Sequence, residues 1–89
     1  MRIVGTIPHP KLKITLMHHG RFLLKLEDVD VEITYRFRDS EGIAKLEDAQ
    51  RALDLGLLQD AERTLMEMSS ARKRYAAMPS QEDEFPSLI

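Results

Sequence analysis

Hydrophobic and polar residues alternate with a period of two through the first half of the chain, which predicts β-strands. The clearest stretch is 30–38, where apolar residues alternate with charged or hydroxylated ones. Similar alternation over 11–18 and 21–27 predicts two further strands, and the pattern over 3–7 predicts a shorter first strand. The apolar side of these strands is expected to comprise Ile3, Ile7, Leu12, Ile14, Leu16, Phe22, Leu24, Leu26, Val31, Ile33, Tyr35 and Phe37.

Short connections between the strands favour an antiparallel meander. A three-residue loop at 18–20 pairs Leu16 with Phe22 and keeps apolar residues opposite one another. Such loops commonly contain a left-handed glycine, a role that suits Gly20. Between the third and fourth strands, a tight turn at 28–29 and a four-residue loop both fit the sequence.

From 44 to 78, apolar residues recur at spacings of three and four, which is typical of helices. Leu46, Ala49 and Leu53 indicate a short helix, and Gly56 is a suitable C-terminal stop for it. A longer helix is expected to follow. Its apolar positions, interrupted by Arg72, are Leu58, Ala61, Leu65, Met68 and Tyr75.

Together these elements predict an α+β fold with two layers, a four-stranded antiparallel β-meander followed by two helices packed on one face. Residues 1–78 are expected to form a single domain. Residues 79–89 are polar and acidic, and we expect them to form a disordered C-terminal tail.

Five short motifs of the strand region resemble a set of small bacterial proteins of unassigned function. The motifs are Ile7-Pro8-His9-Pro10, Lys13-Ile14-Thr15-Leu16, Gly20-Arg21-Phe22, Lys25-Leu26-Glu27 and Glu32-Ile33-Thr34-Tyr35-Arg36-Phe37. The resemblance implies the same strand meander followed by helices, in a bacterial cytoplasmic setting. It implies no activity, ligand or catalytic residue.

Composition excludes several kinds of chemistry. The chain has 89 residues and no cysteine, so it cannot form disulfides, use thiol catalysis or build thiolate zinc sites. Its four glycines are scattered, and its serines lack the surroundings of a catalytic nucleophile. We therefore expect a non-enzymatic protein with no catalytic residue and no cofactor. No apolar run is long enough to span a membrane.

The three histidines do not predict a metal site. His9 precedes the second strand, whereas His18 and His19 follow it. The strand separates its two ends by about 20 Å, far more than shared coordination of one metal allows. A site built from two subunits is the alternative that this spacing leaves open.

The outward side of the strands is predominantly basic, with only Glu27 and Glu32 as acidic members. Its candidate cations are Lys11, Lys13, Arg21, Lys25, Arg36 and Arg38. Such a surface can contact a phosphodiester backbone, but the aromatic residues that usually stack on bases have the opposite parity. The alternative is a solvated face with cross-strand pairs such as Lys11 with Glu27.

Two further features favour protein partners. The longer helix should extend past its sheet, which exposes a candidate self-association surface and predicts a homodimer. That surface comprises Met66, Met68, Arg72, Tyr75 and Met78. In the tail, three acidic residues precede the candidate docking residues Phe85, Leu88 and Ile89. A solubilising tail, or one that folds back onto the basic sheet, is the alternative.

The sequence thus favours a small protein-interaction or regulatory module that self-associates. Weak nucleic-acid binding through the outer sheet face is the second hypothesis. No membrane partner is expected.

Overall fold

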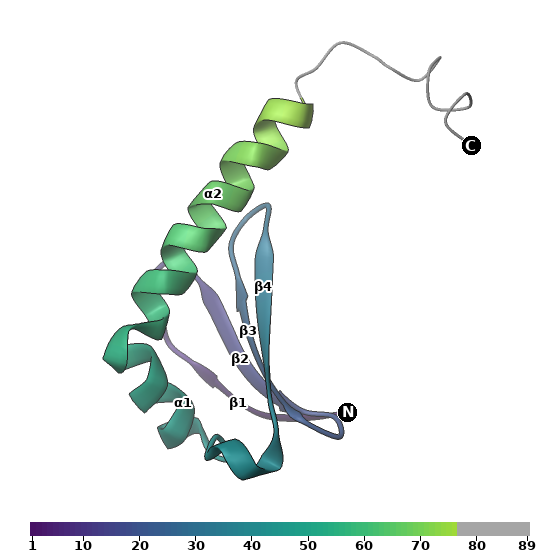
Figure 1. The fold of residues 1–89 in the computed structure, drawn as a ribbon, viewed down its shortest axis with the longest axis vertical. Helices are drawn as coiled ribbons and strands as arrows, with labels where there is room; N and C mark the ends of the chain where they lie inside the picture. Colours follow the sequence, from purple (N-terminus) through teal and green to yellow (C-terminus); the bar gives the residue numbers. More distant parts are fainter. Residues whose placement is uncertain (77–89) are drawn as a thin grey trace, which may run out of the picture.

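The computed structural model describes residues 1–76, which form an α+β fold of four strands followed by a long helical segment (Figure 1). The strands are β1 (Arg2–Ile7), β2 (Lys13–His18), β3 (Phe22–Glu27) and β4 (Glu32–Phe37). A 3₁₀ turn at Asp39–Glu41 leads to α1 (Leu46–Ala52), a π-helical turn (Leu53–Leu57) and α2 (Leu58–Ala76). The domain boundary expected at residue 78 and the tail expected at 79–89 lie outside the described residues.

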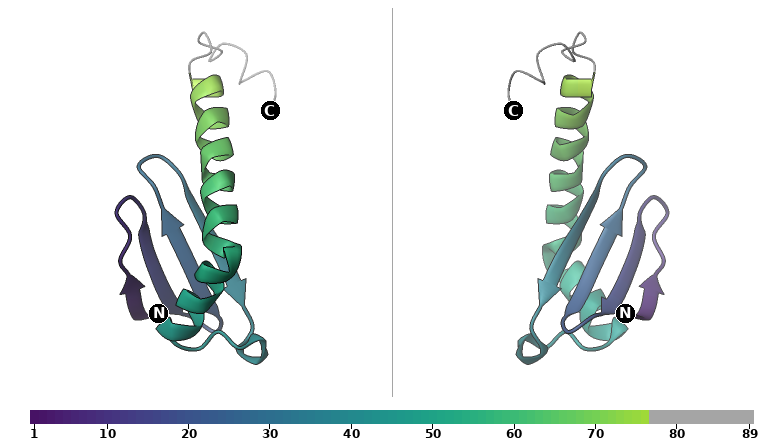
Figure 2. Two further views of the ribbon diagram at one scale, coloured as in Figure 1. Left: turned by 90° about the vertical axis from the view of Figure 1, so that its left-hand side faces the viewer. Right: turned by 90° about the vertical axis from the view of Figure 1, so that its right-hand side faces the viewer.

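The strands pair antiparallel in chain order, so the predicted meander is confirmed. One face of the sheet packs beneath the helices, and no helix of residues 1–76 covers the other face (Figure 2). Four side chains of the central strands are almost completely buried on the helix side: Ile14, Leu16, Leu24 and Leu26. The apolar residues of β4 also pack against this core but are only half-buried, because β4 is an edge strand.

The loop between β2 and β3 has the predicted length but not the predicted position. Leu16 lies opposite Leu24, and His18 lies opposite Phe22, so the loop is 19–21. His18 belongs to the strand because its ring packs against Phe22, with ring centroids 4.5 Å apart. The pairing differs from the predicted one by two residues, so each side chain stays on its predicted face.

The connection between β3 and β4 is the longer of the two alternatives, a four-residue loop at 28–31. The Asp28 N–H donates to the Val31 carbonyl at 2.8 Å, and the Val29 N–H donates to Asp28 Oδ1 at 2.7 Å. These bonds close the loop without requiring positive φ at the β-branched Val29.

A bulge in β1 overturns one predicted core residue. The pairing runs from Ile3 opposite Met17 to Gly5 opposite Leu16, so Val4 is an extra residue. Val4 packs against the core, while Ile3 turns to the other side of the sheet and is 65% exposed. The expectation that Ile3 is buried is therefore wrong, whereas Ile7 is buried as expected.

The two predicted helices are joined into one helical segment over 46–76 rather than separated. Gly56 does not end the first helix; it lies inside the π-helical turn with φ 134° and kinks the segment. The Leu58 N–H still donates to the Leu53 carbonyl across this turn. A glycine permits the change of direction because a side chain would be strained at this φ.

The kink lets the two helical parts cover different regions of the sheet. Leu46 of α1 lies directly over Gly5 of β1, where a side chain would overlap its Cδ1 atom. In α2, Ala61 and Leu65 are buried against the sheet. As the relative lengths predict, α2 continues past the end of the sheet (Figure 1). None of the helices described between residues 1 and 76 combines the length and hydropathy needed to cross a bilayer.

The start of α1 is held by one carboxylate. Asp48 Oδ2 accepts the backbone N–H groups of Ala44 and Lys45, both at 3.1 Å. The Ala44 N–H, aided by that of Lys45 and by the charge of Arg51, lowers the pKa of Asp48, although partial desolvation opposes this shift.

Replacing Gly5 tests the contact between β1 and α1. We expect Gly5→Ala to lower the free energy of unfolding by about 1–3 kcal/mol, because the new methyl group overlaps Leu46. In a Leu46→Ala background the same change should be neutral or stabilising, since alanine is otherwise favoured over glycine by about 0.5–1 kcal/mol. Urea denaturation of the four proteins measures this coupling, with the exposed Thr6→Ala as a control. An equal loss in both backgrounds contradicts the contact.

Replacing Asp48 tests the start of α1. Because its pKa is lower in the folded state, the ionised carboxylate stabilises the fold above the ordinary carboxyl pKa of about 4. This stabilisation is lost as the pH falls through the lowered pKa. Asp48→Asn should therefore be less stable than wild type at neutral pH, and the difference should shrink in acid. Urea midpoints across pH measure this, with Glu47→Gln as a control in the same turn. A difference that is independent of pH contradicts the proposed role of the charge.

Candidate interaction surfaces

The face of the sheet opposite the helices, the outer face, is organised in rows that run across the strands. At the end near the β3–β4 loop, Lys13 lies opposite Glu27 and Glu27 lies opposite Glu32. The neighbouring Lys25 places its Nζ 3.7 Å from Glu27 Oε1 and 3.3 Å from Glu32 Oε2. Positive and negative side chains therefore balance each other at this end.

A different row crosses the outer face near the β2–β3 hairpin. Across the four strands it consists of Ile3, Met17, Leu23 and Arg36. Met17 and Leu23 are half-buried, and they point away from the helices because Leu16 and Leu24, their neighbours in the chain, are completely buried on the helix side. The row therefore presents three adjacent aliphatic side chains, followed on β4 by the guanidinium group of Arg36.

Arg21, in the hairpin loop, adds a second cation beside this row. Arg21, Leu23 and Arg36, together with His19 and Gly20, line a shallow hollow of about 410 Å³. We refer to Ile3, Met17, Arg21, Leu23 and Arg36 as the hairpin surface.

Within residues 1–76, neither Arg21 nor Arg36 has a carboxylate within ion-pair distance, and the same holds for Arg38. Two acidic residues follow Arg38, but both have other contacts. Asp39 Oδ1 lies 3.9 Å from His18 Nε2, and Glu41 Oε1 accepts the Arg38 backbone N–H at 2.7 Å. The positive charge of the hairpin surface is thus not balanced by an ion pair with the described part of the chain.

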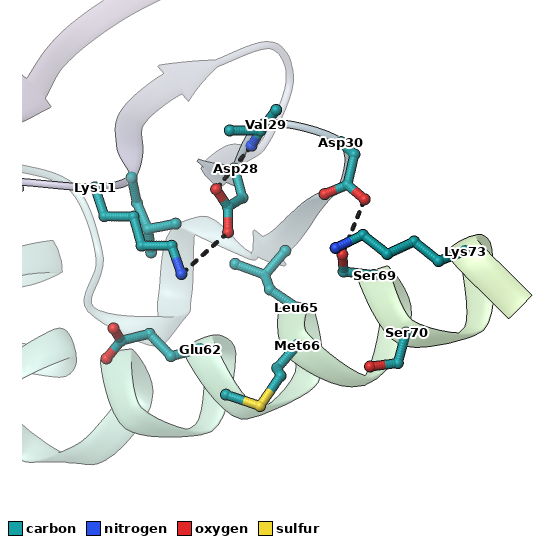
Figure 3. Close-up of a pocket in the computed structure, with 11 residues that line it drawn as sticks. Lys11, Asp28, Val29, Asp30, Glu62, Leu65, Met66, Ser69, Ser70 and Lys73 are labelled. Atoms are coloured by element: carbon teal, nitrogen blue, oxygen red, sulfur yellow. Dashed lines mark hydrogen bonds and ion pairs between the residues drawn. The ribbon is translucent and has the colours of Figure 1, made fainter.

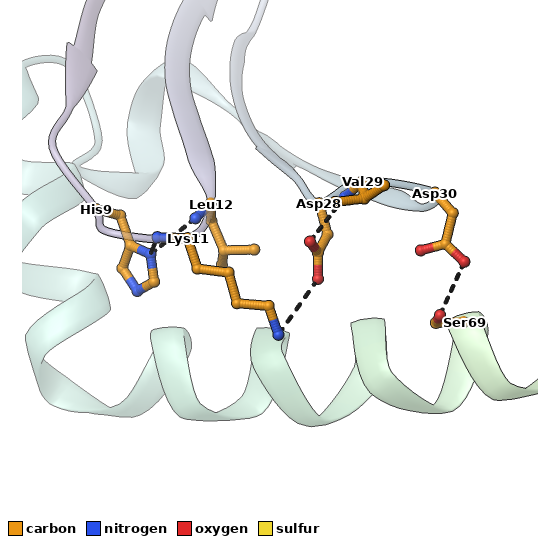
Figure 4. Close-up of polar contacts among 7 residues, drawn as sticks. All are labelled: His9, Lys11, Leu12, Asp28, Val29, Asp30 and Ser69. Carbon is orange, nitrogen blue, oxygen red and sulfur yellow. Dashed lines mark hydrogen bonds and ion pairs between the residues drawn. The ribbon is translucent and has the colours of Figure 1, made fainter.

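One predicted member of the basic face lies elsewhere. Lys11 precedes β2 and points to the helix side, where its Nζ is 3.7 Å from Asp28 Oδ2 (Figure 4). The chain turns here because His9 Nδ1 accepts the backbone N–H groups of Lys11 and Leu12, at 3.0 and 2.9 Å. The expected pair of Lys11 with Glu27 is therefore wrong, since Lys13 is the residue opposite Glu27.

Sequence reasoning missed the aliphatic part of the hairpin surface. A signal was present, because the adjacent pairs Leu16-Met17 and Leu23-Leu24 interrupt the period-two alternation. An apolar residue next to a core residue in a strand must lie on the opposite face. For Ile3 the alternation gave no such warning, since its orientation depends on the bulge.

The histidines occupy three separate environments. His9 holds the turn before β2, His18 packs on Phe22, and His19 lies at the hairpin hollow. In the part of the chain that the structure describes, no three His, Asp or Glu side chains are placed to hold a metal ion.

A second hollow, of about 390 Å³, lies between α2 and the loops at the other end of the sheet (Figure 3). The two aspartates that line it, Asp28 and Asp30, have polar partners. Ser69 Oγ donates to Asp30 Oδ2 at 2.9 Å, and Arg72 lies 3.7 Å from the same oxygen. The pair of Lys11 and Asp28 joins the two loops, and the contacts of Asp30 join the β3–β4 loop to α2. We interpret this polar cluster as structural.

Among the predicted self-association residues of α2, Met66 lies on a different side of the helix from Met68, Arg72 and Tyr75. Met66 is 69% exposed beside the second hollow, whereas Met68 and Arg72 lie against the β3–β4 loop. Tyr75 is nine residues after Met66, which places the two on opposite sides of a helix. Met78 and the candidate docking residues Phe85, Leu88 and Ile89 lie outside the described residues.

Comparisons with known proteins give no relative for this chain: no protein family, no curated protein and no solved structure matches it.

Replacing Ser69 tests the structural reading of the second hollow. Ser69→Ala should lower the free energy of unfolding by about 0.5–1.5 kcal/mol, because it removes the hydrogen bond to the half-buried Asp30. Ser70→Ala is the matched control; Ser70 is exposed, and its replacement should change stability by less than about 0.5 kcal/mol. Urea denaturation measures both, and equal effects contradict the anchoring role of Ser69.

Proposed function

We propose that this chain is a non-enzymatic protein-interaction module that self-associates, and that its hairpin surface binds a protein segment carrying carboxylates beside aliphatic side chains. One observation supports this proposal most directly. The hairpin surface places two guanidinium groups without ion-pair partners in residues 1–76 beside a row of three aliphatic side chains.

Tight binding at this surface needs both the two arginines and the aliphatic row. An exposed ion pair contributes only about 0–1 kcal/mol, so arginines alone bind an acidic segment weakly. Burial of apolar area adds about 25 cal/mol per Å², and Ile3 offers most of its side chain for burial. A ligand that carries both carboxylates and apolar side chains gains from ion pairing and from apolar burial. Carboxylates suit the arginines because a guanidinium group can bind a carboxylate with two parallel hydrogen bonds.

Single-stranded nucleic acid is the second candidate, because arginines without ion-pair partners in residues 1–76 also suit phosphate groups. Sheets that bind single strands usually stack bases on aromatic side chains. Here Phe22, Tyr35 and Phe37 face the helix side and pack in or against the core. The burial of Tyr35 is reflected in its pKa, which is raised by desolvation and by the charge of Asp60. The aliphatic row therefore favours a protein partner.

Binding of defined probes to the full chain tests the proposal. We expect a peptide of alternating glutamate and leucine to bind, and a peptide with serine in place of leucine to bind about tenfold or more weakly. Methyl NMR should place the bound peptide at Ile3, Met17 and Leu23. Arg21→Gln combined with Arg36→Gln, and separately Leu23→Ser, should each weaken binding by about tenfold.

The matched control is Arg51→Gln combined with Arg63→Gln, which removes the same charge from exposed helix positions. This variant should bind like wild type, and circular dichroism checks that every variant is folded. Equal binding of the two peptides contradicts the role of the aliphatic row. Tighter binding of a single-stranded oligothymidine than of either peptide, abolished by the Arg21 and Arg36 changes, supports the nucleic-acid candidate instead.

A further inference from the structure

We infer that the ligand of the hairpin surface is the acidic C-terminal segment, residues 82–89, of a second copy of this chain. This inference rests on the proposed function and names its partner. Every lysine and arginine of the chain precedes residue 76, whereas Glu82, Asp83 and Glu84 follow it. The described part is therefore slightly positive, and the segment after it is negative.

The segment also has the chemistry that the hairpin surface requires. Its three carboxylates are followed directly by Phe85, Leu88 and Ile89, so that acidic and apolar groups lie within eight residues. On the hairpin surface, Arg21 and Arg36 adjoin Leu23 in the same way. Charge can thus be neutralised and apolar area buried by one short peptide.

The positions of the two sites favour a second copy over the same chain. α2 ends at the opposite end of the molecule from the β2–β3 hairpin (Figure 1). From Ser69, which contacts Asp30, to Ala76 the helix rises by about 10 Å away from the sheet. From Asp28 back to Arg21 the chain covers about 23 Å in the other direction.

A path of roughly 33 Å therefore separates Ala76 from the hairpin surface, before any detour around the sheet. Glu82, Asp83 and Glu84 are six to eight residues beyond Ala76, and a fully extended chain of that length spans about 20–29 Å. Their carboxylates reach the arginines of their own chain only with the backbone and both side chains stretched. Such an extended state is entropically costly.

A second copy removes this difficulty. When two molecules lie antiparallel, the end of each α2 is beside the hairpin of the other, and each copy provides one surface and one segment. A two-fold pair then makes the same contact twice, and the second contact forms within an existing complex. The expected assembly is a closed dimer with reciprocal exchange of the C-terminal segments.

Charge reversal in the full-length chain tests this assignment. One variant combines Arg21→Glu with Arg36→Glu, and the other combines Glu82→Lys, Asp83→Lys and Glu84→Lys. We expect wild type to form dimers that weaken with salt, and each variant alone to self-associate about tenfold or more weakly. An equimolar mixture of the two should restore association, because each variant then supplies what the other needs. Sedimentation velocity measures all four samples.

The matched control is Arg51→Glu combined with Arg63→Glu, which should dimerise like wild type. Dimers that persist in the Glu82, Asp83 and Glu84 variant overturn the inference, as does a monomeric wild type at millimolar concentration in low salt.

A synthetic peptide of residues 79–89 separates this inference from the proposed function. Added to the variant with reversed tail charges, the peptide should bind at the hairpin surface. If it does not bind while the glutamate–leucine peptide does, the inference is wrong and the proposed function stands. If wild type is monomeric and binds the peptide more weakly than that variant does, the segment occupies its own chain and the second-copy assignment is wrong.

Discussion

The architecture depends on one constraint: a four-stranded sheet with one strongly apolar face must bury that face, and within residues 1–76 the helical segment 46–76 covers it. Leu16, Leu24 and Leu26 have no exposed surface, and Leu65 of α2 is 2% exposed above them. The kink at Gly56 lets one helical segment cover two regions of this face: α1 lies over β1, and α2 lies over the strands farther along the sheet. Covering one face leaves the other open, so side-chain parity decides which residues are available to a partner.

Parity was readable from the sequence within β2, β3 and β4, where it depends only on neighbours along the strand, but not for Ile3, whose side of the sheet is set by the bulge. The register of β2 and β3 was not readable, since two registers that differ by two residues both place apolar residues opposite each other. In the observed register His18 packs against Phe22, a contact that alternation along the chain does not reveal. The bulge at Val4 and the joining of the helices through Gly56 are likewise decided by packing against other elements.

The candidate site was likewise predictable from the sequence only in part. Period-two alternation identified Arg21 and Arg36 as outward cations, and both line the hairpin hollow. Alternation could not say which cations are neutralised, because Lys25 meets Glu27 and Glu32 only through the observed pairing of β3 and β4. It also misplaced Lys11, whose orientation is fixed by hydrogen bonds between His9 and the backbone of the turn.

The two ends of the outer face therefore differ in what a ligand can gain. At the loop end, Lys25 already lies within 3.7 Å of two carboxylates, so an incoming anion must compete with them. At the hairpin end, Arg21 and Arg36 line one hollow, and neither has a carboxylate of residues 1–76 within ion-pair distance. An anion that binds there does not have to displace an existing ion pair, and the adjacent aliphatic row adds apolar surface that a ligand can bury. The uneven distribution of ion pairs, rather than the number of cations, is the reason that we propose the hairpin end as the binding surface.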